Sequence, residues 1–152
     1  MCPGKSTRRV ERILLCVTLL SLSGCGPTGP QGGPRVGTVQ VTGIVHVDGQ
    51  PAPFLKVVAV PAEGKSVVPM ESASLTSDIG EFSLSTYETG DGVPEGIYKL
   101  LFTWGQINLM NGQYSGDKLK GKFADPSKSE FSLTVTAGSE PQNLGIIELT
   151  TK

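Results

Sequence analysis

The sequence predicts an all-β protein, a seven-stranded antiparallel Greek-key sandwich that follows an N-terminal signal helix and a flexible linker. Three observations support this fold class. From residue 38 onward, every recognisable segment has apolar residues that alternate with a period of two, and none has helical spacing. Turn signals rich in Gly, Pro and Asp separate the alternating segments. The segments are short and number seven, as in an antiparallel sandwich.

The first 24 residues have the layout of a secretory signal. Residues 1–12 are basic, and residues 13–22 are apolar apart from Thr18 and Ser21. An apolar run of about ten residues rises only about 15 Å as a helix, half the thickness of a hydrocarbon core. We therefore expect a signal rather than a transmembrane span. The basic residues are Lys5, Arg8, Arg9 and Arg12, with Glu11 the one acid among them.

The end of this signal resembles the lipobox of bacterial lipoproteins. Leu22, Ser23, Gly24 and Cys25 supply an aliphatic residue, two small residues and a cysteine. The resemblance implies cleavage between Gly24 and Cys25 and attachment of a diacylglyceryl group and palmitate to Cys25, whose thiol is the nucleophile. An ordinary cleaved signal and an uncleaved anchor are the alternatives. Because one acyl chain binds a membrane only marginally, two or three chains on Cys25 are expected to hold the protein there.

Cleavage would change the composition of the mature chain. Cys2 and Cys16 leave with the signal and Cys25 is alkylated, so disulfides, thiolate catalysis and cysteine metal sites are excluded. The whole chain has 13 Lys and Arg and 14 Asp and Glu; losing four basic residues and one acid leaves a net charge near −4. This charge argues against nucleic acid as a partner and against a polybasic grip on anionic lipid.

A tether and one domain follow the signal. Residues 26–37, "GPTGPQGGPRVG", are mostly Gly and Pro and can reach about 30 Å or more when stretched. The predicted organisation is therefore a signal at 1–24, a lipidated cysteine and tether at 25–37, and a sandwich domain at 38–152, which is an ordinary size for one domain.

The seven predicted strands follow in order, with turns at 48–53 ("DGQPAP") and a tight hairpin at 78–80 ("DIG"). They are 38–47, 54–61 (closed by Pro61), 72–77, 81–86, 96–104, 130–136 and 144–150. The side chains expected to point inward are Val39, Val41, Val45, Val47, Tyr98, Leu100, Phe102, Trp104, Phe131, Leu133 and Val135. Tyr98 follows Gly96 at a strand start and is placed to hydrogen-bond back across a corner.

Four short motifs resemble the carboxypeptidase regulatory-like, transthyretin-like (prealbumin-like) sandwich, in the version found in short bacterial lipoproteins. They are Gly43 to Val45, Asp48 to Pro51, Ser77 to Phe82 (with Ser77 where Thr is usual) and Gly96 to Tyr98. The resemblance covers essentially all of residues 38–152 and extends to "LKGKFADPSKSEFSLTV". It implies the fold, but the motifs are turn and core positions and imply no activity.

No catalytic, cofactor or metal residue is predicted. His46 is the only histidine and is expected on the polar face of the first strand, exposed to solvent. The hydrolase branch of transthyretin-like proteins uses several histidines, so its activity does not carry over. A Lys–Asn isopeptide bond needs an inward lysine in the first strand, which has none, and an asparagine in the last, which Asn143 merely precedes.

Acidic residues gather near turns and leave calcium binding open as an alternative to solvated turns. The stretch "TYETGDGVPEG" contains Glu88, Asp91 and Glu95 but no D-x-D-x-D-G loop. The other acidic turn residues are Asp48, Asp78 and Glu81.

Residues 105–129 show little periodicity and are longer than most loops. Leu119, Gly121 and Phe123 alternate with Lys118, Lys120 and Lys122, which favours an edge strand guarded by charge. The alternative is a partner-binding loop that uses exposed apolar side chains and lysines.

These features predict a membrane-anchored surface or periplasmic lipoprotein of the bacterial cell envelope. Its domain is expected to be a non-catalytic structural module, or one that binds a protein or glycan. A ligand- or calcium-binding sandwich and an accessory subunit of an envelope enzyme are the alternatives. Gly26, rather than an acidic residue, follows Cys25, which favours an outer-membrane location over inner-membrane retention.

Overall fold

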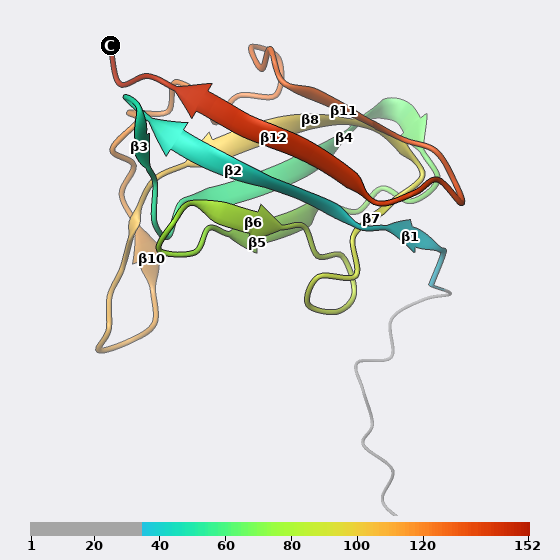
Figure 1. Ribbon diagram of the computed structural model, residues 1–152, viewed down its shortest axis with the longest axis horizontal. Helices are drawn as coiled ribbons and strands as arrows, with labels where there is room; N and C mark the ends of the chain where they lie inside the picture. The colour runs from blue at the N-terminus through green and yellow to red at the C-terminus, as the bar shows by residue number, and fades with distance from the viewer. Residues whose placement is uncertain (1–34) are drawn as a thin grey trace, which may run out of the picture. The chain divides into compact units, whose positions relative to one another are not determined.

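The computed structural model describes residues 35–152, and these form strands, turns and loops without a helix (Figure 1). The predicted signal, cleavage position and most of the tether lie outside the described residues. In the described part, seven strands exceed two residues: β2 (Val41–Val47), β4 (Lys56–Ser66), β5 (Ser72–Leu75), β6 (Glu81–Ser83), β8 (Gly96–Thr103), β11 (Ser132–Val135) and β12 (Gln142–Leu149). The two-residue strands are β1 (Thr38–Val39), β3 (Gln50–Pro51), β7 (Val93–Pro94), β9 (Gln106–Ile107) and β10 (Tyr114–Ser115). Each predicted strand overlaps a longer strand, so the all-β prediction is confirmed.

Two four-stranded sheets share one core. One sheet has the strand order β11-β8-β4-β5, and the other has the order β12-β2-β3 with β6 also paired to β2. Figure 1 shows β12 and β2 in front of β8 and β4. A single cluster of buried apolar side chains has members from both sheets. The arrangement is a sandwich, in which each sheet buries its apolar face against the other.

The alternation of apolar residues in the sequence corresponds to the alternation of burial in the strands. In β2, every second residue is buried and those between are half-buried. Trp104 and Phe131 are only partly buried, although they pack against the core cluster. The other predicted inward residues are fully buried: Val39, Val41, Val45, Val47, Tyr98, Leu100, Phe102, Leu133 and Val135.

The pairing of β12 with β2 corrects the expectation that all strands run antiparallel. β12 lies parallel to β2, with Gln142 opposite Val41 and Leu149 opposite Val47. The chain leaves β11 in one sheet and crosses to the other before β12 begins, so β12 starts beside the start of β2. Apolar alternation is the same for both directions, because side chains change face at every residue in either case. The other strand pairs within residues 35–152 are antiparallel.

The tight hairpin predicted at 78–80 is confirmed, and it has a further role that the sequence did not predict. It is tight: the N–H of Gly80 donates to the carbonyl of Ser77 at 2.9 Å, and the N–H of Ser77 donates to the carbonyl of Glu81 at 2.8 Å. Ala73 before the turn and Ser85 after it form an antiparallel bridge with reciprocal backbone hydrogen bonds, so the predicted hairpin closes. Because β5 also pairs with β4 and β6 pairs with β2, the same hairpin crosses between the two sheets. Gly80 has a φ of +81°, and a Cβ there would lie 2.5 Å from the carbonyl oxygen of Val45. Only glycine fits this crossing.

Strand β4 continues past Pro61, where the sequence pattern closed the strand. Pro61 lies opposite Tyr98, and the pairing of β4 with β8 then shifts register before Ser66 lies opposite Gly96. Proline has no N–H to donate to the neighbouring strand, which fits an irregularity here. The extension places the hydroxyl of Ser66 2.9 Å from that of Tyr98.

The predicted turn at Asp48 and Gly49 is confirmed. Both residues have positive φ, 51° and 78°, as in a type I′ turn. The carboxylate of Asp48 accepts a hydrogen bond of 2.6 Å from the hydroxyl of Thr151, and its N–H donates to the carbonyl of Leu149 at 2.9 Å. The hydrogen bonds from Thr151 lower the pKa of Asp48. This turn therefore holds the end of β12.

Candidate functional site

The predicted lipid-attachment residue, Cys25, and the cleavage position between Gly24 and Cys25 lie outside the described residues. The described chain begins at Arg35, whose guanidinium lies 2.5 Å from the carboxylate of Glu88 and 5.6 Å from the centre of the Tyr87 ring. The N–H of Val36 donates to the hydroxyl of Tyr87 at 3.4 Å. The described end of the predicted tether is therefore held by the turn that contains Tyr87 and Glu88.

The carboxylate of Asp91 organises that turn. It accepts hydrogen bonds from the N–H groups of Thr86, Tyr87 and Glu88 at 2.7, 2.9 and 3.1 Å. Its oxygens therefore face backbone donors, while Glu88 faces Arg35. Within residues 35–152, no three His, Cys, Asp or Glu side chains come together as metal ligands. The arrangement favours structural turns over the calcium site that the acidic stretch left open.

His46 lies across from Glu148 on the neighbouring parallel strand. Its Nδ1 is 3.1 Å from a carboxylate oxygen of Glu148, and its side chain is 22% exposed. His46 lies on the polar face as predicted, but it is half-buried rather than exposed to solvent, and the sequence did not predict this partner. The pairing depends on the parallel register of β12, which puts Glu148 directly beside His46.

Asn143 lies inside β12, whereas the sequence pattern placed it just before the strand. It is exposed, and its side-chain oxygen accepts a hydrogen bond of 2.8 Å from the N–H of Gly145. The register of β12 against β2 shifts between Asn143 and Ile146. Asn143 therefore supports an irregularity in the strand, and β2 contains no lysine that could bond to it.

The edge strand favoured for residues 118–123 is wrong, because this segment forms successive turns. Asp117 accepts hydrogen bonds from the N–H groups of Trp104, Leu119 and Gly121 at 2.9, 2.9 and 2.7 Å. Leu119 is buried in the core, which accounts for the apolar signal without a strand. The ammonium of Lys118 lies 4.3 Å from the centre of the Trp104 ring.

The segment before these turns forms a projecting hairpin, defined here as residues 106–115. β9 and β10 pair with Ile107 opposite Tyr114, and Figure 1 shows the hairpin leaving the body of the two sheets. Leu109 and Met110 at its tip are 95% and 96% exposed. They are the most exposed of the large apolar side chains in the described part of the chain. The sequence identified these residues as apolar but not their position at a tip.

The hydroxyl of Tyr114 fixes the base of the hairpin. It accepts a hydrogen bond of 2.6 Å from the N–H of Gly105 and lies 2.7 and 3.0 Å from the carbonyl oxygens of Thr103 and Phe54. Burial raises the pKa of Tyr114. A neutral phenol can both accept and donate here, so the hairpin is tied to the end of β8 and to the loop before β4.

An open groove of about 720 Å³ lies where β5 and β6 meet. Its apolar lining comes from both sheets and from the hairpin. Ser83 also lines it, and the Ser83 hydroxyl is buried without a hydrogen-bond partner. The size and mixed lining are those of a small-ligand or peptide groove. The apolar side chains are Ile44, Phe54, Leu75, Phe82 and Ile107.

Comparisons with known proteins assign no family. No protein-family model matches the sequence, and no curated protein matches it. Among solved structures, a 9R-lipoxygenase from Cyanothece PCC8801 is similar over 77% of this chain, with 11% identity and a TM-score of 0.39. This chain spans about 17% of that structure, and the similarity is too low to indicate a shared activity. No helix among residues 35–152 is long and apolar enough to cross a membrane.

Proposed function

We propose that this protein is a bacterial lipoprotein whose domain is held at a membrane of the cell envelope by acyl chains on Cys25. The observation that supports this most strongly is the sequence Leu22-Ser23-Gly24-Cys25 at the end of a basic and then apolar segment. A protein held by acyl chains lies on a membrane without spanning it. Gly26 after the lipidated position favours the outer membrane or its periplasmic face.

The domain of this lipoprotein is a non-enzymatic module of the transthyretin-like sandwich class. Seven longer strands in two sheets around one core support that class. The sequence motifs also fall at structural positions: Gly43 in β2, Asp48 at a type I′ turn, Gly80 at the crossing between sheets and Gly96 at the start of β8. Three of these residues are glycines, and the carboxylate of Asp48 is held by Thr151, so the motifs specify the fold and support a structural or binding role.

A second candidate function is favoured by the groove between β5 and β6. Its volume of about 720 Å³ and its largely apolar lining suit an extended peptide or a glycan. Such a ligand would make this lipoprotein a binding module rather than a purely structural one. A ligand that binds only the folded state would raise the unfolding temperature, which tests this candidate directly.

The anchor is tested by replacing single cysteines. Cys25→Ser should abolish incorporation of labelled palmitate, and the precursor should keep its signal. Cys16→Ser is the matched control, because it removes a thiol from the signal and should leave labelling unchanged. Intact mass of the membrane fraction should show an acylated Cys25 as the first residue. Labelling that survives Cys25→Ser, or a mature chain with a bare N-terminus, would contradict the proposal.

A further inference from the structure

The tip of the hairpin has a composition unlike the rest of the surface. From Trp104 to Gly116 there is no charged side chain, although charged residues resume at Asp117. The two most exposed large apolar side chains in the described part of the chain, Leu109 and Met110, are adjacent in the middle of this uncharged segment. Scattered exposed apolar residues are ordinary, but a pair at a projecting point indicates a contact surface.

Several N–H groups at the tip are hydrogen-bonded within the hairpin. The N–H of Gly112 donates to the carbonyl of Asn108 at 2.7 Å, and the N–H of Asn108 donates to the carbonyl of Gln113 at 2.8 Å. The side-chain oxygens of Asn108 and Asn111 accept from the N–H groups of Met110 and Gln113 at 2.9 and 3.0 Å. These hydrogen bonds lower the cost of moving those N–H groups out of water into an apolar environment.

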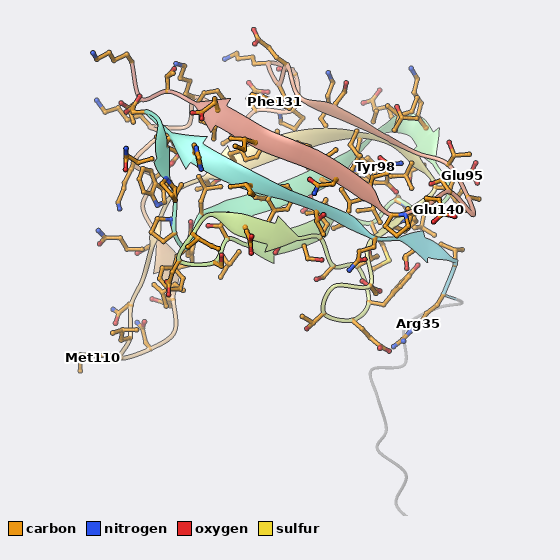
Figure 2. The ribbon with its side chains drawn as sticks, viewed as in Figure 1. Arg35, Glu95, Tyr98, Met110, Phe131 and Glu140 are labelled. Atoms are coloured by element: carbon orange, nitrogen blue, oxygen red, sulfur yellow. The ribbon has the colours of Figure 1, made fainter. Side chains whose placement is uncertain are left out.

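The position of the tip relates it to the described start of the chain. Figure 2 shows Met110 and Arg35 both on the lower side of the domain, towards opposite ends of its long axis, while Figure 1 shows the C-terminus on the upper side. Nine residues separate Cys25 from Arg35, and such a stretch spans at most about 30 Å. An acylated Cys25 would therefore keep a membrane within reach of the side that carries the tip.

We propose that Leu109 and Met110 insert into the surface of the membrane that holds the acyl chains of Cys25. This inference rests on the proposed lipid anchor. Because the anchor keeps the domain at the membrane, a shallow contact of two side chains is enough to orient it. The hairpin has no charge to desolvate and needs no anionic lipid, which suits a mature chain of net charge near −4. This contact would give the domain, and with it the groove between β5 and β6, a fixed orientation relative to the membrane.

The test uses the lipidated full-length product with a bimane dye at Met110→Cys. Once the signal is removed and Cys25 acylated, the introduced thiol is the only free one. The protein is reconstituted into vesicles of phosphatidylethanolamine with a minority of phosphatidylglycerol, some of them with spin-labelled lipids. Ser132→Cys is the control, because Ser132 is exposed and follows Phe131, which Figure 2 places on the opposite, upper side. Intact mass of each sample verifies acylation.

We expect a blue shift and quenching by spin labels at position 110, consistent with insertion of about 5–10 Å, and neither effect at position 132. Adding Leu109→Ser to the labelled Met110→Cys variant should weaken the quenching. Equal quenching at both positions, or none at 110, in acylated samples overturns the insertion and leaves the anchor standing. A blue shift at 110 only in native envelope vesicles also overturns it, since a protein partner would then hold the tip. If intact mass shows that Cys25 carries no acyl chains, the proposed lipid anchor itself is overturned.

Discussion

The phenol of Tyr98 donates a hydrogen bond of 2.9 Å to the carbonyl oxygen of Pro94, four residues earlier in the chain. Tyr98 is fully buried, and Pro94 ends β7 just before β8 begins at Gly96. The hydrogen bond therefore closes the corner between two strands, as the position of Tyr98 after Gly96 predicted. This prediction of a tyrosine corner is confirmed.

Replacing Tyr98 by phenylalanine should lower the free energy of unfolding by about 1–3 kcal/mol, because the buried carbonyl of Pro94 would lose its donor. Urea unfolding of the purified protein measures the change. Tyr87→Phe is the control: its hydroxyl makes only a 3.4 Å contact with the N–H of Val36, so the expected change is within about 0.5 kcal/mol. Equal effects of the two substitutions would contradict a structural role for the corner.

Alkaline pH should destabilise the protein through its buried phenols. Burial raises the pKa of both Tyr98 and Tyr114 in the folded state. The unfolded chain loses these protons first, at about pH 10, so the contribution of the two phenols to stability is constant below about pH 10 and is lost as the pH rises through the folded pKa values. Unfolding temperatures measured across this range should decline, and a Tyr98→Phe, Tyr114→Phe variant should decline less steeply. If the unfolding temperature of that variant declines with pH as steeply as that of the unsubstituted protein, other groups cause the alkaline loss of stability.

Period-two alternation predicted the strands and their inward faces because burial on one face is a local property of the sequence. Val41, Val45 and Val47 are buried for this reason, whichever strand lies beside them. Strand direction and partner are not local. The parallel pairing of β12, and with it the contact of His46 with Glu148, depends on where the chain crosses between sheets.

The segment from 105 to 129 shows a second limit of the sequence pattern. Leu119 lies in a turn, and its side chain is buried in the core. Its alternation with lysines therefore has the same pattern as an edge strand, although no strand forms. Leu109 and Met110 are equally apolar but fully exposed. Only the placement of β9 and β10 separates these two situations, because the residue types are the same. The sequence therefore shows that Leu109 and Met110 are apolar, but it does not predict that they are exposed at a projecting tip.

Gly43 is expected to be intolerant of any side chain. A Cβ at this position would lie 2.8 Å from two ring carbons of Phe82, which is buried on the neighbouring strand β6. Gly43→Ala should therefore lower the free energy of unfolding by about 1–3 kcal/mol through overpacking. Gly37→Ala is the matched control, since nothing lies within 4 Å of a Cβ there. Thermal unfolding compares the two variants, and a stable Gly43→Ala protein would show that the Phe82 ring can move aside.

Thr76 comes directly after strand β5 and connects it to the loop before β4. Its hydroxyl accepts a hydrogen bond of 2.8 Å from the N–H of Leu55 and donates to the carbonyl of Ala52, and the residue is only 2% exposed. Valine has the same shape but leaves both backbone groups unpaired inside the protein. Thr76→Val should therefore lower the free energy of unfolding by about 1–3 kcal/mol for each group left unsatisfied.

Thr76→Ser separates the hydroxyl of Thr76 from its methyl group. Serine keeps both hydrogen bonds and removes one buried methyl, so the expected loss is about 0.8 kcal/mol. Urea unfolding of both variants gives the comparison, and amide hydrogen exchange at Leu55 should be faster in Thr76→Val than in Thr76→Ser, because only valine releases that N–H. If Thr76→Ser destabilises the protein as much as Thr76→Val, packing of the methyl rather than hydrogen bonding holds this loop.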